Sequence, residues 1–449
     1  MKRGAVLALA LASCHGGCSA ANDLENSNND AAPNASSIAA LGDATVLSPA
    51  RCTAISKHAA IGSPVDVGEA VTTRDSFAIG LLREKNIFSV AITPFDLASV
   101  TFADIGPARG EAAPPLPFLW DNSVYVAWID SGALRIGRVA DGTVALIVDE
   151  AIDVAAYLAK EPTSDIPAFD VAVSADHGVV VWDYANPSGG MIRRLAFSKA
   201  GAEKGDGGSA YGALSPTTSD ADSPRLAPRK GGGFWAIWVA HKPESTVDAS
   251  AIEGPGESPT YRWLEAVPLD ARGNRVGDVV RLTPTLGHVA GYDVSSTAEL
   301  AQIVVRDATE SPDDGTTLSR ILLSDKPASP ELVASDIGRA VPDVLGVASG
   351  SSGSGSIAWV VAPDLTDSTR IVPLSAPSAR LESARLESAR LESASVEPLL
   401  KSSRGLALRW TESGGQLLVL RVASGSASGG PNPNGPQETA EIAVVSCGR

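Results

Sequence analysis

A short apolar strand that ends in tryptophan recurs along this chain and constrains its fold more than any other feature. Five copies end in Trp, and two weaker copies end in an aliphatic residue. In chain order, the equivalent positions are Leu81, Trp128, Trp182, Trp238, Val305, Trp359 and Trp410. Neighbouring copies lie 47 to 67 residues apart. A unit of this length cannot bury both of its faces alone, so the units must stack on one another.

Each unit contains more than the tryptophan strand. A second β-rich run follows it and carries an Arg near its start, as at Arg135, Arg193, Arg262, Arg320 and Arg370. Gly, Pro, Ser and Asp separate the runs, which is typical of strands joined by tight turns. A Pro-containing run precedes the tryptophan strand, so that the tryptophan strand is expected to be the second of three or four antiparallel strands.

Units of this kind that are arranged radially make a β-propeller. The sequence therefore predicts an all-β fold, a single β-propeller with seven four-stranded blades, in which Trp packs between blades. Six or eight blades, or two β-sandwiches, are the alternatives. Propeller closure would bring the first and last strands side by side.

The N-terminus has the features of an export signal. Lys2 and Arg3 precede an apolar stretch over residues 5–12, which is too short to span a membrane. The stretch ends in Leu11-Ala12-Ser13-Cys14, which resembles the lipobox of bacterial lipoproteins. The resemblance implies that residues 1–13 are removed, and that Cys14 carries a lipid anchor into the membrane of the cell envelope, with the outer membrane favoured. An ordinary secretory signal is the alternative.

The rest of the chain divides into a tether and a folded part. Residues 14–44 are mostly polar and lack periodicity, so we expect a flexible tether. Residues 45–449 are expected to form the propeller domain. The formal charge of −16 argues against nucleic acid as a partner.

Three further cysteines remain after Cys14. An exported protein meets an oxidising compartment, where disulfides persist. Cys52 opens the expected propeller and Cys447 nearly ends it, so a Cys52–Cys447 disulfide is predicted if the fold joins its ends. Two unpaired thiols are the alternative, and Cys18 is left unassigned.

Acidic residues follow the tryptophan position in several units. They are Asp130, Asp183, Asp307 and Glu412. Because insertions gather between the second and third strands of the units, these acids are predicted to lie with the long loop from His241 to Thr260 on one binding face. That face would suit a protein or glycan ligand, although acids that bond only to nearby hairpin amides are the simpler interpretation.

Catalytic and cofactor motifs are missing from the sequence. The five His residues stand far apart, and there is no zinc spacing, nucleophile elbow, phosphate loop or dinucleotide fingerprint, so no cofactor is predicted. These absences favour a binding or scaffolding module. The alternatives are a cell-surface hydrolase or lyase that acts on glycans, whose site residues would come from several blades, and an envelope-assembly component.

Overall fold

The computed structural model divides the chain into two units, Met1–Thr45 and Val46–Arg449. It describes residues 52–64, 66–109, 112–152, 167–186, 189–203, 211–216, 220–229, 231–243, 260–285, 287–296, 301–306, 318–323, 327, 329–334, 343–348, 357–363, 369–374, 403–411, 414–423 and 439–447, some of them by backbone alone. The expected signal sequence, Cys14, Cys18 and the tether lie outside these residues.

The described residues of the second unit form seven antiparallel sheets and no α-helix. One 3-10 turn, Glu84–Asn86, joins two strands. No helix in the described part is long and apolar enough to cross a membrane.

The first two sheets of the chain have four strands each. The first holds β2 (Asp66–Thr72), β3 (Ser76–Arg83), β4 (Ile87–Pro94) and β5 (Thr101–Pro107). The second holds β6 (Leu116–Trp120), β7 (Ser123–Asp130), β8 (Ala133–Ala140) and β9 (Thr143–Ala151).

The next three sheets continue the order. The third holds β10 (Phe169–Val173), β11 (His177–Asn186), β12 (Gly189–Ser198), β13 (Gly201–Ala202) and β14 (Tyr211–Ala213). The fourth holds β15 (Asp220–Pro228), β16 (Phe234–Pro243), β17 (Thr260–Leu269) and β18 (Val280–Arg281). The fifth holds β19 (Gly291–Ser296), β20 (Ala301–Arg306), β21 (Leu318–Leu323) and β22 (Glu331–Ala334).

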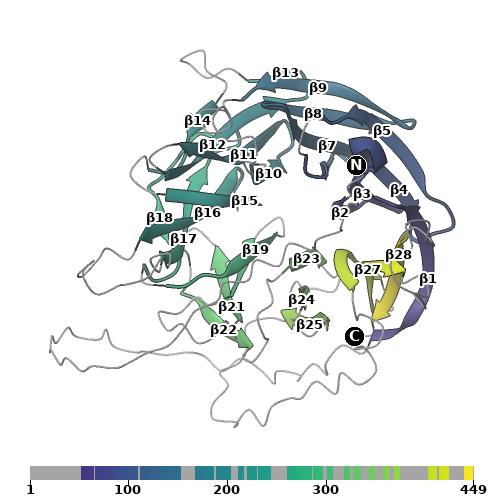
Figure 1. Cartoon of the computed structure of the whole chain (residues 1–449). Helices are drawn as coiled ribbons and strands as arrows, with labels where there is room; N and C mark the ends of the chain where they lie inside the picture. Colours follow the sequence, from purple (N-terminus) through teal and green to yellow (C-terminus); the bar gives the residue numbers. More distant parts are fainter. Residues whose placement is uncertain are drawn as a thin grey trace, which may run out of the picture. The chain divides into compact units, whose positions relative to one another are not determined.

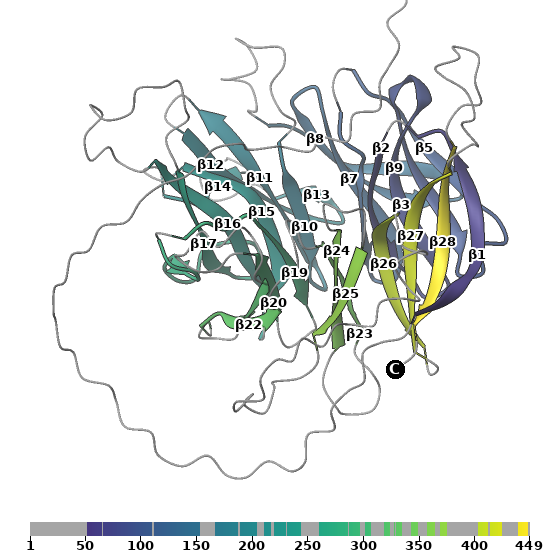
Figure 2. The ribbon, with the colours of Figure 1, turned by 60° about the horizontal axis from the view of Figure 1, so that its bottom comes forward.

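The last two sheets differ in how they are assembled. The sixth has three described strands, β23 (Asp343–Ala348), β24 (Ile357–Pro363) and β25 (Thr369–Leu374). The seventh joins both ends of the folded part, and its strands are β26 (Ser403–Thr411), β27 (Gly414–Ala423), β28 (Thr439–Cys447) and β1 (Cys52–Gly62). Figure 2 shows β1 at the edge of this sheet, beside β28.

The sheets are arranged around their first strands. In chain order, β2, β6, β10, β15, β19, β23 and β26 each contact the next, and β26 also contacts β2. Figure 1 shows these strands toward the centre of the unit, with the later strands of each sheet outside them. This arrangement confirms the predicted all-β propeller, although the third and sixth sheets have five and three described strands in place of the expected four.

The three repeat tryptophans whose side chains the structure describes pack between neighbouring sheets, as predicted. Trp182 on β11 is fully buried with Trp120 and Phe197 in a cluster shared by the second and third sheets. Trp238 on β16 is fully buried among residues of the third and fourth sheets. Trp128 on β7 packs against Leu82 and Phe88 of the first sheet. Large flat side chains thus fill the space between twisted sheets, where apolar burial contributes about 25 cal/mol per Å².

One part of the predicted repeat is wrong. Trp410 lies on β26, the first strand of the seventh sheet, whereas the other tryptophan positions lie on second strands. Consequently Glu412 follows a first strand and is not equivalent to Asp130. Both β26 and β27 are rich in apolar residues and only two residues separate them in the sequence, so the sequence pattern does not distinguish the first strand from the second.

The arginine strands are third strands in five sheets, as predicted. Arg135, Arg193, Arg262, Arg320 and Arg370 lie on β8, β12, β17, β21 and β25. The spacing between the tryptophan position and the arginine, which varies among these sheets, therefore reflects the connection between the second and third strands.

Candidate functional site

The first strand of the fourth sheet is distorted where it meets its neighbour. The ladder between β15 and β16 changes register between Asp222 and Arg225, and Ser223 has a φ of 52°. A positive φ in a residue other than glycine costs about 1–3 kcal/mol, and bulges are common beside active sites. The hydroxyl of Tyr292 lies 2.6 Å from the carbonyl oxygen of Ser223 and 3.0 Å from that of Ile237. The hydroxyl proton of Tyr292 is therefore shared between these two carbonyl oxygens, and the two hydrogen bonds hold the bulge in place.

Four charged side chains on four first strands form a group that we call the central cluster. Its members are Glu69 on β2, Asp170 on β10, Arg225 on β15 and Asp293 on β19. Asp170, Arg225 and Asp293 occupy equivalent positions along their strands. Each pairs with the residue that precedes the tryptophan position of the neighbouring second strand; these partners are Val181, Ile237 and Val304. Glu69 lies in the bulge of β2 between Val67 and Ala70.

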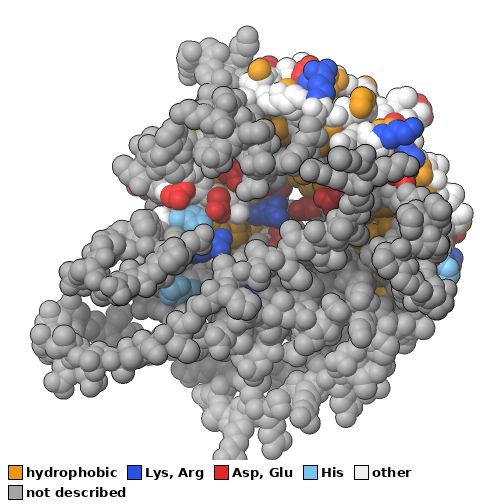
Figure 3. Space-filling model, viewed as in Figure 1, with side chains coloured by type: hydrophobic (Ala, Val, Ile, Leu, Met, Phe, Trp, Pro, Cys, Tyr) orange, Lys and Arg blue, Asp and Glu red, His pale blue; other side chains and the backbone are white. Residues whose placement is uncertain are grey.

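Arg225 is the centre of this group. Its Nη2 lies 3.4 Å from Oε1 of Glu69, and its Nε lies 3.5 Å from Oδ1 of Asp293. Since β2 and β15 belong to sheets that are not neighbours, the pair with Glu69 reaches across the centre of the propeller. Figure 3 shows basic, acidic and histidine side chains gathered there in a hollow. Burial lowers the pKa of Arg225, but the carboxylates of Glu69, Asp293 and Asp170 raise it more, so the guanidinium stays charged.

Asp170 is the member with the most unusual environment. Its Oδ2 accepts a hydrogen bond of 2.7 Å from the amide of Leu226 on β15, and its Oδ1 accepts one of 2.8 Å from the amide of Val171. Burial raises the pKa of Asp170 to about 6, against the opposing charge of Arg225 and with a further increase from Glu69. The residue as a whole is half-buried, and burial around its carboxyl group is the main cause of the raised pKa. It can exchange a proton near neutral pH.

A histidine–aspartate pair lies beside the central cluster. His241 at the end of β16 places Nε2 2.6 Å from Oδ2 of Asp222 on β15. Burial raises the pKa of Asp222, but His241, Ser223 and Arg262 lower it more, and the net direction is downward. Arg262 on β17 is the ladder partner of His241. Within the described part of the chain, Oδ1 of Asp222, Nε2 of His241 and Nε of Arg262 are buried and make no hydrogen bond, so the 2.6 Å contact between His241 and Asp222 is a close approach of the two groups.

The two groups are electrostatically linked through Tyr292. Burial raises the pKa of its hydroxyl well above the usual value; Arg225 opposes this shift, and the carboxylates of Asp170, Asp222 and Asp293 add to it. The tyrosine therefore remains a neutral hydrogen-bond donor at all physiological pH values, as its role at the bulge requires.

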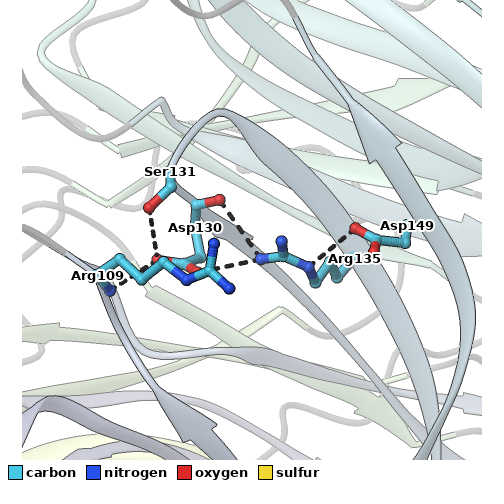
Figure 4. A network of polar contacts seen from close by, with 5 residues as sticks. All are labelled: Arg109, Asp130, Ser131, Arg135 and Asp149. Carbon is cyan, nitrogen blue, oxygen red and sulfur yellow. Dashed lines mark hydrogen bonds and ion pairs between the residues drawn. The ribbon is translucent and has the colours of Figure 1, made fainter.

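Asp130, a residue of the expected binding face, belongs to a separate network at the β7–β8 hairpin (Figure 4). It accepts a hydrogen bond of 2.9 Å from the amide of Arg109 and pairs at 3.1 Å with Arg135. Arg135 also contacts Asp149 at 2.9 Å, and Ser131 lies 3.3 Å from Asp130. Asp130 is buried, so this network matches the simpler interpretation, in which a hairpin acid bonds nearby groups.

The other expected site residues divide as follows. Asp183 lies on β11 directly after Trp182, is half-buried and has interactions of its own. Asp307 and Glu412 lie outside the described residues, as do residues 244–259 of the long loop. Of the expected set, His241 is the residue that the structure places beside the central cluster.

The sequence does contain a signal for the missed residues. Asp-Val pairs occur in four first strands, at Asp66, Asp170, Asp293 and Asp343, and the first three of these aspartates each accept a 2.8 Å hydrogen bond from the following amide. This recurrence marks first strands, but it does not indicate that Glu69 and Arg225 join the same group. Among the described residues, no three His, Cys, Asp or Glu side chains are placed to hold a metal ion.

Comparison with known proteins gives likenesses of fold alone. No family model and no curated protein sequence matches the chain. The structure is similar to an α-L-arabinanase from Penicillium chrysogenum, with a TM-score of 0.39 and 9% identity over 72% of this chain and 97% of that one. It is similar to the polysaccharide lyase Uly1, with a TM-score of 0.42 and 8% identity over 84% and 89% of the two chains. An acylaminoacyl peptidase gives a TM-score of 0.42 and 8% identity over 79% of this chain and 48% of that one.

Proposed function

We propose that this chain is a glycan-acting hydrolase whose site is the central cluster, with Asp170 as the proton donor. The observation that carries the proposal is the meeting of Asp170, Asp293 and Glu69 around Arg225 at the centre of the propeller. Cleavage of a glycosidic bond uses one carboxyl group that is protonated and a second that is ionised.

The environments of the carboxyl groups support this division of roles. Burial raises the pKa of Asp170 to about 6, so its carboxyl group is protonated in mildly acidic solution, as a general acid must be. Asp293 lies 3.5 Å from Arg225, and a neighbouring positive charge favours the ionised form of a carboxyl group. It is therefore the candidate for the second carboxylate, with Glu69 on the opposite side of Arg225.

The histidine–aspartate pair extends the site toward the β16–β17 connection. Arg262 and Asp222 each offer a buried polar atom that has no partner in the described part of the chain. A sugar presents hydroxyl groups that donate and accept hydrogen bonds, so it could satisfy both atoms. In this proposal, His241, Asp222 and Arg262 hold the sugar ring next to the cleaved bond.

A second candidate function is a binding module that holds a glycan without cleaving it. The observation that favours it is that both carboxylate oxygens of Asp170 already accept hydrogen bonds from backbone amides. A carboxyl group that clamps β10 to β15 would be costly to use in catalysis.

The location of the protein is part of the proposal. The lipobox-like segment at Cys14 supports a lipid-anchored protein of the cell envelope, where a glycan would be met outside the cytoplasm. Replacing Cys14 by Ser should move the protein from the membrane fraction to the soluble fraction, which cell fractionation and immunoblotting would measure. A variant that stays in the membrane fraction would contradict the lipid anchor without affecting the proposed site.

The enzymatic proposal is tested by incubating the purified full chain with a panel of neutral and acidic polysaccharides at mildly acidic pH. Release of new reducing ends is the expected result. Asp170→Asn should lower turnover at least about 100-fold, because general acid catalysis contributes 10²–10⁴-fold, and should leave glycan binding intact.

The matched control is Asp149→Asn, which removes an exposed carboxylate of the hairpin network and should leave turnover unchanged. Binding without turnover on any polysaccharide would support the second candidate and reject the hydrolase. Turnover that survives in Asp170→Asn would remove Asp170 from the mechanism.

A further inference from the structure

The sheet that joins the two ends of the folded part pairs two cysteines. β1, the first described strand of the chain, runs antiparallel to β28, the last one, and the ladder begins with Cys52 opposite Cys447. Residues directly opposite each other in an antiparallel pair have Cα atoms about 4.5–5.5 Å apart. That spacing falls inside the range of about 4.4–6.8 Å in which disulfides form.

We propose that Cys52 and Cys447 form a disulfide bond that ties β1 to β28 and so fastens the propeller. The residue on the other side of Cys447 in the same row is Gly415 on β27. Because glycine has no side chain, that position places no side chain next to Cys447 in the row.

The ladder between β1 and β28 is the most irregular of its sheet, because β26 and β27 pair with one register shift. The pairing of β1 with β28 shifts register at three places, between Thr53 and Ile55, between Ile55 and Lys57, and between Ala60 and Gly62. The pairing of β27 with β28 runs through nine residue pairs without a shift. A ladder with repeated shifts loses regular hydrogen bonds, so β1 is held less firmly than the strands inside the sheet.

The position of this ladder makes its integrity important for the whole unit. β1 is an edge strand, and no further strand covers its outer side in the described sheet. The seventh sheet is also the place where β26 meets β2, so the first and last parts of the folded chain are held together here. Loss of β1 would expose the edge of β28, and an exposed edge strand can pair with another chain.

The chemistry requires an oxidant. Each thiol loses a proton, and together they pass two electrons to a disulfide-carrying oxidoreductase or to a small-molecule disulfide. One cysteine thiolate attacks the oxidant's disulfide, and the second then displaces the reduced oxidant from the mixed disulfide, leaving a single Sγ–Sγ bond. An exported protein meets such oxidants, so this step depends on the export signal over residues 1–13 and not on the proposed enzymatic activity.

Peptide mapping tests the bond directly. The purified full chain is alkylated under denaturing conditions without reductant and is then cut after Lys and Arg. Cys52 falls in the peptide of residues 52–57, Cys447 in the peptide of residues 422–449, and Cys18 in a third peptide that ends at Arg51. A linked pair of the first two peptides, which separates after reduction, is expected. Alkylated Cys52 and Cys447, or a link from either to Cys18, would overturn the proposal.

Thermal unfolding provides a second test that does not depend on mapping. The variants Cys52→Ser, Cys447→Ser and the double variant should all show the same fall in the unfolding midpoint, on the order of 5–10 °C for a bond that closes so long a loop. Dithiothreitol should lower the wild-type midpoint to that of the double variant and should leave the double variant unchanged. The control Cys18→Ser should respond to reductant as the wild type does. Additive losses in the two single variants, or a wild type that is insensitive to reductant, would show that the cysteines act only as packed thiols.

Discussion

The interfaces between sheets and the first strands at the centre are built on opposite principles. Between the second and third sheets, Trp182, Trp120 and Phe197 are buried in one apolar cluster, and the β11–β12 ladder runs without a register shift. At the centre, Arg225 and Glu69 are charged and remain 32% and 50% exposed. The strands that carry them, β15 and β2, are both bulged.

The difference separates the part of the fold that supplies stability from the part in which we propose the functional site. Apolar packing between sheets supplies free energy that does not depend on any single polar contact. Because this packing stabilises the fold, the first strands can tolerate the strained backbone at Ser223 and the three carboxylates that surround the guanidinium of Arg225. Functional sites commonly break local rules in this way, because the surrounding structure compensates for the cost.

The largest expected effect lies in the sheet interface. Trp182→Ala should lower the free energy of unfolding by about 3–5 kcal/mol, since a fully buried tryptophan leaves a large cavity. Chemical denaturation would measure it. Trp182→Phe should lose less, because the ring still fills part of the space. If both variants lose the same small amount of unfolding free energy, the packing between sheets is not the main source of stability.

The next effect concerns the pH dependence of the centre. The pKa of Asp170 is about 6 in the folded protein, above its usual value of 3.8, so the folded chain binds more protons than the unfolded chain between these values. The free energy of unfolding should therefore fall by about 1–3 kcal/mol as pH rises from about 4 to about 6. If Asp170 is the proton donor, kcat/KM should also fall above about pH 6.

Asp170→Asn supplies the control for both pH effects. The variant keeps an oxygen that can accept the hydrogen bond of Leu226 but cannot titrate. Its stability should depend less on pH than that of the wild type over the same range. An unchanged slope, measured by denaturation across pH, would place the titration elsewhere.

A smaller effect is expected at the bulge. Tyr292→Phe removes the hydroxyl that bonds the carbonyls of Ser223 and Ile237, and should cost about 1–2 kcal/mol of stability. If the central cluster binds a glycan as proposed, the variant should also weaken that binding, because Asp222 and Arg225 flank the released bulge. Calorimetric titration would measure this. Tyr125→Phe is the matched control, since its ring packs on Phe118 and Trp120 in the sheet interface. Equal losses of binding in both variants would contradict a special role for the bulge.

The smallest effect is expected at the hairpin network. Asp149→Asn breaks an exposed ion pair with Arg135 and should change stability by less than about 0.5 kcal/mol. Asp130→Asn should cost more, because Asp130 is buried and also accepts the amide of Arg109. The same denaturation assay would rank the two variants, and a reversed order would contradict a larger contribution from the buried contacts of Asp130 (Figure 4).

Much of the architecture could be predicted from local sequence pattern. The tryptophan strand, the following arginine strand and the turn residues between them predict an all-β propeller, because alternation and turn chemistry act over a few residues. The same reasoning fails at Trp410, where two adjacent apolar strands give the same pattern and only their position in the sheet separates them.

The candidate site could not be predicted in the same way. Asp130 is a candidate because it follows a tryptophan position, and His241 because it begins the long loop, yet Asp130 belongs to a hairpin network and His241 pairs with Asp222. Glu69 and Arg225 are 156 positions apart in the chain and carry no shared motif. Their meeting depends on the circular order of the sheets and on two bulges, neither of which leaves a periodic trace.

The sequence by itself therefore determined the repeating unit, the strand content and the cysteines that open and end the folded part. Tertiary structure alone decided which charged residues face one another, since the first strands of distant sheets converge only after the sheets have packed. It also decided that Cys52 stands opposite Cys447, because strand register is fixed by pairing across the whole length of the fold. Short-range pattern specifies the elements, and long-range packing specifies the site.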